Sequence, residues 1–131
     1  MKKVLFVLSL VAVMVSCSKS PADEAVAILE NSEKEFAAAD SYKAMCDALL
    51  NFAKEADAFV KANKDFKPQG EDLKKIQEAE AKMGKAVEAA GNNLEKKYAG
   101  KEDEAVAVFF IVMGEIEKNY PDAKEFSFSK D

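Results

Sequence analysis

Few side chains in this sequence have the chemistry to form a catalytic or metal site, and those few are widely spaced. Cys17 and Cys46 are its two thiols, and its densest group of carboxylates is the run Glu102-Asp103-Glu104. The chain has no histidine, so it lacks the commonest general base at neutral pH and the commonest zinc ligand. A Ser-His-Asp or Cys-His site therefore cannot form within it, and we predict no catalytic residue.

The run Glu102-Asp103-Glu104 could in principle attract a divalent cation. Adjacent residues on a helix do not face one another, and the spacing differs from that of a calcium-binding loop. We interpret the run as surface charge that complements a helix N-terminus, and we predict no metal and no cofactor. An enzyme that works through carboxylates alone stays open as a third hypothesis, and it would need a cleft that holds two carboxyl groups with separated pKa values.

Cys46 is the second thiol, and three interpretations are open for it. It can be a small buried hydrophobic residue, a partner in an intermolecular disulfide, or a reactive thiol. The first is favoured, because no histidine or arginine is present to lower the pKa of the thiol.

The charge balance argues against nucleic acid as a partner. Beyond Lys2 and Lys3 the chain carries 17 basic and 24 acidic residues, a net charge of −7, and none of the basic residues is arginine. A negative protein repels phosphate backbones, and without arginine it lacks the side chain that binds phosphate and guanine through two hydrogen bonds. We therefore expect no nucleic-acid binding.

The residues before Cys17 indicate where the chain is directed. Lys2 and Lys3 precede an apolar stretch from Val4 to Val15, which is too short to span a hydrocarbon core that needs roughly 20 helical residues. A positive start followed by a short apolar stretch is typical of a signal peptide, which is removed from the mature protein.

The end of that stretch, Met14-Val15-Ser16-Cys17, resembles the lipobox of bacterial lipoproteins. The resemblance implies cleavage before Cys17 and fatty acylation of that cysteine, which would anchor the protein in a membrane. Ser18 stands where an aspartate commonly retains such proteins at the inner membrane. The resemblance therefore implies the outer membrane, with the periplasmic face favoured over the cell surface. It covers residues 1–17 only.

The remaining sequence predicts four helices. Apolar side chains recur at helical spacing over 21–39, 42–63 and 71–98, and a fourth helix is expected from Glu102 to just before Pro121. Ser20 and Pro21 are suited to a helix start, and Gly100 is suited to the position after a helix end. A break is expected at Asp40-Ser41, although one continuous rod from 21 to 63 is the alternative.

The segment 105–113 is apolar around its whole circumference, which is typical of a central or interface helix. Its repeating stripe, which we expect to face the core, is Val106, Phe109, Met113, Ile116 and Tyr120. The remaining apolar residues are predicted to contact another protein or another copy of the chain, and they are Val108, Phe110, Ile111 and Val112. The alternative is that Phe126 and Phe128 in the C-terminal tail cover them.

We therefore predict an all-α protein, a small antiparallel bundle of three to four helices. The expected segments are a signal peptide (1–16), a lipidated cysteine with a short tether (17–20), the bundle (21–120) and a C-terminal tail (121–131). The leading functional hypothesis is a non-enzymatic envelope lipoprotein that meets the membrane through Cys17 and an envelope protein, or itself, through the fourth helix. The alternative is a small carrier of an apolar ligand or lipid.

Overall fold

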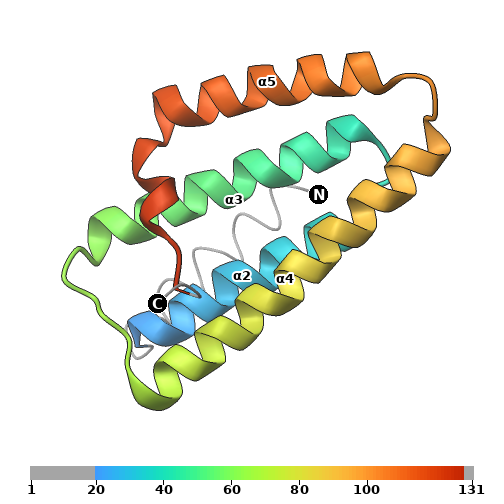
Figure 1. The fold of residues 1–131 in the computed structure, drawn as a ribbon. Coiled ribbons are helices and arrows are strands. Elements are labelled where there is room, and N and C mark those ends of the chain that lie inside the picture. Colours follow the sequence, from blue (N-terminus) through green and yellow to red (C-terminus); the bar gives the residue numbers. More distant parts are fainter. Residues whose placement is uncertain (1–19, 129–131) are drawn as a thin grey trace, which may run out of the picture.

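The computed structural model describes residues 20–128, and in that range it contains helices and no strand. The elements are α2 (Pro21–Ala38), α3 (Tyr42–Ala62), α4 (Gly70–Lys97), α5 (Glu102–Asn119) and the short 3-10 helix η2 (Pro121–Glu125). Consecutive helices run in opposite directions (Figure 1). The predicted all-α antiparallel bundle is confirmed. Cys17 and the proposed signal peptide lie outside the described residues.

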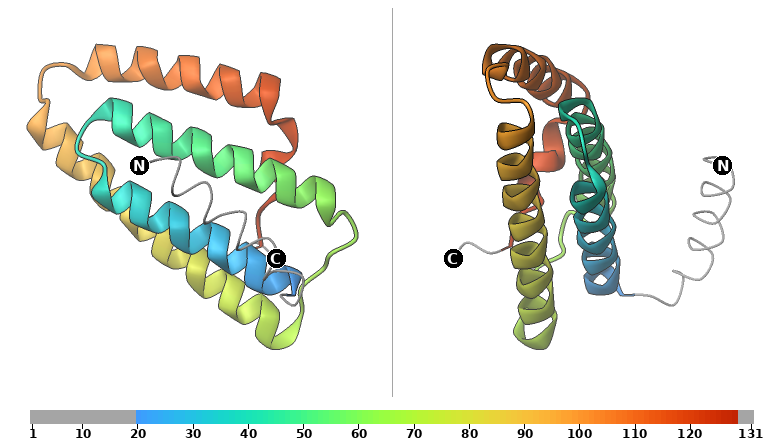
Figure 2. Two further views of the ribbon diagram at one scale, coloured as in Figure 1. Left: turned by 180° about the vertical axis from the view of Figure 1, so that it is seen from behind. Right: turned by 90° about the vertical axis from the view of Figure 1, so that its right-hand side faces the viewer.

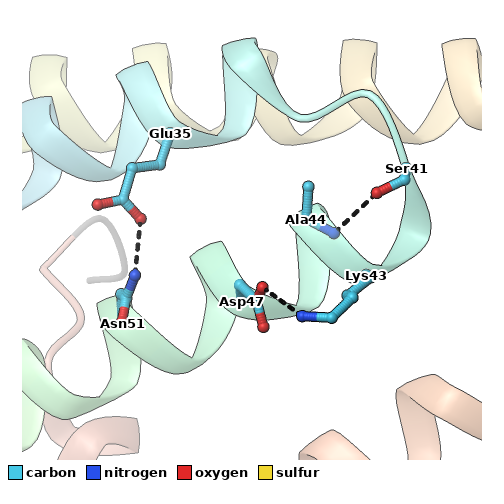
Figure 3. Close-up of polar contacts among 6 residues, drawn as sticks. All are labelled: Glu35, Ser41, Lys43, Ala44, Asp47 and Asn51. Carbon is cyan, nitrogen blue, oxygen red and sulfur yellow. Dashed lines mark hydrogen bonds and ion pairs between the residues drawn. The ribbon is translucent and has the colours of Figure 1, made fainter. Parts of the chain in front are cut away.

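The helix boundaries follow from side chains that cap them. The Ser20 hydroxyl accepts a hydrogen bond from the Asp23 N–H at 3.2 Å and starts α2, and the Ser41 hydroxyl accepts one from the Ala44 N–H at 3.0 Å and starts α3 (Figure 3). The chain therefore breaks between α2 and α3, as predicted, and does not form one rod. Gly100 has a φ of 93°, a left-handed conformation that glycine adopts without strain, between α4 and α5.

The four helices pack as a series in which α2 is central and α5 is peripheral. α2 lies against α4 on one side and α3 on the other, and α3 in turn carries α5 and η2. Figure 2 shows α5 at one edge of the bundle, beside α3. In this arrangement α5 has a helix on one side only, whereas α2 and α3 each have neighbours on two sides.

Small side chains allow the inner helices to approach closely. Ala22 and Ala25 of α2 are completely buried, as is Ala56 of α3, and they lie in one cluster with larger side chains. The larger buried members of this core cluster are Leu29, Phe59, Ile76 and Phe126. Between α2 and α3 a hydrogen bond from the Asn51 amide to the Glu35 carboxylate, 3.3 Å long, lies at the surface (Figure 3).

The segment after α5 turns back into the bundle. Phe126 is 5% exposed and belongs to the core cluster, and its ring packs edge-on against Phe59 with the ring centres 5.3 Å apart. The backbone of Phe128 is fixed to α4, because the Gln77 amide donates to its carbonyl and its N–H donates to Glu80. The alternative in which Phe126 and Phe128 cover the outer side of α5 is therefore wrong.

Candidate functional site

The most unusual surface of the described chain is on α5. Val112 is the only buried residue of this helix, at 6% exposure. Six large apolar side chains of the same helix are between 38% and 70% exposed even with the C-terminal segment in place. We call these six residues the α5 surface: Val106, Val108, Phe109, Phe110, Ile111 and Met113.

The residues predicted to contact a partner do not all lie on this surface. Phe110 and Ile111 are the most exposed, at 70% and 69%, and Val108 is 39% exposed. The prediction that Val112 contacts a partner is wrong, because Val112 is on the side of α5 that faces the bundle and is buried there. A contact surface in the described structure therefore excludes Val112.

The prediction that one stripe of α5 faces the core is wrong for three of its five residues. Val106, Phe109 and Met113 are 52%, 49% and 38% exposed, so they extend the outer surface instead of filling the core. The packed side of α5 is centred on Val112 and includes the partly buried Ala105 and Ile116. A helix that is apolar all round gives no periodic signal of which side is packed, so the sequence could not fix its rotation.

The size of the α5 surface separates it from ordinary exposed hydrophobic residues. With about 200 Å² for a large apolar side chain, the six partly exposed residues leave on the order of 600 Å² in water. This is at the upper end of the roughly 300–600 Å² found for the largest apolar patch on a typical monomer. Patches of this size mark contact sites for proteins or membranes.

Charged residues border the α5 surface at both ends of the helix. Glu102, Asp103 and Glu104 are exposed in its first turn, and Lys118 is in its last. The Glu102 carboxylate accepts a hydrogen bond from the Gly100 N–H at 3.1 Å, and this bond is the largest cause that lowers the pKa of Glu102. Among residues 20–128, no group of three possible metal-binding side chains comes together, and no helix is long and apolar enough to cross a membrane.

Two hollows in the surface of the described residues have the volume of a small-molecule site. The larger, about 670 Å³, is lined by a mixture of side chains that includes Phe59, Lys64 and Asp122. The smaller, about 400 Å³, lies where α3, α4 and α5 meet, and Tyr42, Tyr98 and Val108 line it. Both are open to solvent, whereas most small-molecule sites enclose the larger part of their ligand.

One carboxylate on the surface, Glu55, has a raised pKa, a property that general acids use. Partial desolvation, and secondly the charge of Glu35, raise the pKa of Glu55. Both side chains lie on the exposed sides of α2 and α3, and neither lines either hollow. Glu35 and Glu55 are therefore separate from both hollows.

Cys46 is placed where a small hydrophobic residue would be. It is 8% exposed and is a free thiol among the described residues. Burial, and secondly the charge of Asp47, raise the pKa of this thiol, which lowers the fraction of reactive thiolate. Its environment is that of a structural residue.

A buried carboxylate fixes the end of the bundle where α5 stops. Asp57 is 6% exposed on α3, and its two oxygens accept hydrogen bonds from the Lys61 ammonium and from the Asp122 N–H of η2, the latter at 2.9 Å. The hydrogen bond from Lys61 is the main cause that lowers the pKa of Asp57. Because η2 directly follows α5, this contact helps to position the peripheral helix on α3.

Acid should weaken this contact. A carboxyl whose folded pKa is lowered stabilises the fold above its ordinary pKa of 3.8, and the effect is lost as the pH falls through the lower folded value. We expect Asp57→Asn to lower the Tm by a few degrees at neutral pH and to differ less from the parent chain in strong acid. Thermal unfolding followed by circular dichroism across this range would measure the difference.

The control for Asp57 is a similar pair on the same helix. Lys43 and Asp47 are also four residues apart, but their side chains are 83% and 57% exposed, and such pairs contribute little. Asp47→Asn should therefore leave the Tm unchanged at every pH. If the two asparagine variants behave alike, Asp57 does not have the stabilising role that its burial indicates.

Comparison of the chain with protein-family models, with curated proteins and with solved structures finds no match in any of the three. The function must therefore be argued from the chain itself, and the α5 surface is the feature that requires an explanation.

Proposed function

We propose that this protein is an envelope lipoprotein, anchored through fatty acyl chains on Cys17, whose helical bundle docks a protein partner on the α5 surface. In this proposal the bundle has no catalytic activity. The partner belongs to the cell envelope, and the bundle acts as a tethered interaction module or accessory subunit.

The observation that carries the proposal is the exposure of Phe110 and Ile111. They lie within the nine-residue apolar run 105–113 and are 70% and 69% exposed, although the same chain buries Leu29, Ile76 and Leu94 almost completely. Contact with water at apolar side chains costs free energy that burial against a partner would recover. Aromatic residues at the centre of an exposed patch are also the typical anchors of protein interfaces.

The proposed anchor brings the α5 surface close to a membrane. α2 begins at Pro21, so only residues 18–20 separate the helix from Cys17, and fully extended they span on the order of 10 Å. Durable anchoring needs more than one acyl chain, which the lipobox resemblance implies. A partner at the same membrane would therefore meet the α5 surface at high effective concentration. We place the anchor in the outer membrane, on its periplasmic face.

A site-specific photo-cross-linker tests the docking site. A benzoylphenylalanine would replace Phe110 in the full-length chain within a bacterial envelope, and the matched control would carry the same group at Lys85, which is exposed on α4. We expect one discrete adduct, identified by mass spectrometry, from position 110 and not from position 85. Absence of any adduct from position 110, or the same adducts from both, would overturn the proposed function.

The anchor gives a separate prediction. Cys17→Ala should abolish incorporation of an alkyne-labelled fatty acid, because it removes the thiol that the lipobox resemblance assigns to acylation. Cys46→Ala is the matched control and should keep full labelling, since Cys46 is buried. The measurement is gel fluorescence after coupling a dye to the probe, and undiminished label in the Cys17→Ala chain would contradict lipidation at this residue.

A second candidate function is a carrier of a small apolar ligand. The hollow bounded by Tyr42, Tyr98 and Val108 favours it, because its volume of about 400 Å³ and the aromatic and aliphatic part of its lining suit a small hydrophobic molecule. A fluorescent apolar probe that binds with micromolar affinity, and that loses this affinity in Val108→Asp, would support the carrier.

A further inference from the structure

We infer that the partner docked on α5 is a second copy of this chain, bound through an antiparallel pair of α5 helices that cross between Phe110 and Ile111. The inference rests on the proposed function, because it names the partner of the same surface. When a second copy of α5 lies antiparallel to the first, the residues on the outward side of one helix pair with residues of complementary type on the other.

The outward side can be derived from helical geometry. At 3.6 residues per turn, six residues lie within about 100° of arc whose centre is about 30° from the direction opposite the buried Val112, and Glu117 lies just outside this arc. All six belong to the exposed class. In chain order they are Asp103, Ala107, Phe110, Ile111, Gly114 and Lys118.

This row has a symmetric order of residue types. It has an acid at one end and a base at the other, a small residue inside each of these, and two large apolar residues in the centre. If two copies lie antiparallel with Phe110 of each facing Ile111 of the other, the same register sets Ala107 against Gly114. It also sets Asp103 against Lys118. An isologous interface needs such self-complementarity, because a two-fold axis makes every contact twice.

Each pair has a physical role in this register. The contact between Phe110 and Ile111 buries the two most exposed large apolar side chains among residues 20–128. Gly114 has no atom within 4 Å of the place where a Cβ would be, so its surface is open to a neighbouring helix, and the small Ala107 allows the two backbones to approach. Asp103 with Lys118 is an exposed pair at the rim, and rim charges set register more than affinity.

The outward row supplies part of the area of a dimer. Its two large apolar side chains, Phe110 and Ile111, leave roughly 280 Å² in water. A stable interface buries about 800 Å² on each partner, so the rest must come from the smaller and charged residues of the row and from the rim around it. Opposed helix dipoles also favour the antiparallel arrangement.

The proposed anchors are compatible with this pairing. The start of α2 lies at the same end of the bundle as the end of α5 (Figures 1 and 2). An antiparallel pair therefore carries its two anchors at opposite ends. Both anchors reach one leaflet when the two-fold axis is perpendicular to the membrane and the bundles lie flat on it.

The test is cysteine cross-linking of the full-length chain in a bacterial envelope, in a Cys46→Ala background that removes the native thiol of the bundle. One tagged copy carries Ala107→Cys and a differently tagged copy carries Gly114→Cys. Both positions are exposed, so neither change should disturb folding. In the proposed register residue 107 faces residue 114, whereas like positions are about 10 Å apart along the helix.

We expect mild oxidation to link the mixed pair at least tenfold more than either variant with itself, measured on non-reducing gels. A chain with neither new cysteine gives the background. Failure of the mixed pair to link, or equal linking in all combinations, would overturn the second-copy proposal. Suppose that the mixed cysteine pair does not link but the photo-cross-linker at position 110 forms an adduct with a different protein. The second-copy proposal then fails and the proposed function stands. If the photo-cross-linker at position 110 forms no adduct, both the second-copy proposal and the proposed function fail.

Discussion

Replacing Phe126 with alanine should lower the free energy of unfolding by about 3–5 kcal/mol, the usual cost of removing a buried phenylalanine. The ring is 5% exposed, and its centre lies 5.2–5.8 Å from those of Phe52, Phe59 and Phe128 in edge-on contacts. A domain of this size has about 5–15 kcal/mol of net stability, so the loss is a large part of the total. Urea titration followed by circular dichroism would measure it.

The matched control is Phe110→Ala, the same chemical change on a side chain that is 70% exposed. Substitution of an exposed residue that makes no cap, buried contact or hydrogen bond usually changes the free energy of unfolding by no more than about 0.5 kcal/mol. The two variants should therefore differ by several kcal/mol. If Phe110→Ala destabilises the isolated chain as much as Phe126→Ala does, Phe110 belongs to the core and the α5 surface is not a free contact site.

The second large effect concerns docking. A double variant with Phe110→Ser and Ile111→Ser should reduce the yield of partner adduct at least tenfold, because central aromatic and aliphatic anchors each contribute about 2 kcal/mol or more to a typical interface. The photo-cross-linker in this experiment replaces Val106, which is 52% exposed on the same surface. The Tm of the double variant should stay within a few degrees of the parent value, because both side chains are exposed in the bundle.

The control for the double variant is Lys82→Ser with Lys85→Ser, on the exposed side of α4. Its adduct yield should equal that of the parent chain. An unchanged yield in the Phe110/Ile111 variant would remove the α5 surface from the docking proposal. A large fall in Tm would instead show that these residues support the fold.

The helix boundaries could be predicted because local side chains determine them. Ser20 with Pro21, Ser41 and Gly100 each act within a few residues of their own position, and the predicted ends agree with the observed ones to within one residue. The centre of the bundle was less predictable. In α3 the large apolar residues Met45 and Leu49 are partly exposed. Ala48 and Ala53 are buried instead, because α3 packs against neighbours on two sides.

The candidate site was predicted only in part, because its geometry depends on contacts distant in the sequence. The apolar excess of the fourth helix was visible in the sequence, and Phe110 and Ile111 were among the residues it indicated. The rotation of α5, which buries Val112 and exposes Phe109, depends on packing against α3 and η2. The destination of Phe126 also depends on tertiary packing, since an alternating Phe-Ser-Phe segment can cover any apolar surface.

The one-sided packing of α5 has a consequence for how the bundle opens. A helix that contacts the rest of the structure mainly through α3 and η2 can detach while α2, α3 and α4 stay together. Local openings of this kind cost less than global unfolding, and native-state amide hydrogen exchange measures them residue by residue. Amides of α5 should exchange fastest among the four helices and those around Leu29 in α2 slowest, with occupation of the α5 surface slowing exchange in α5 most.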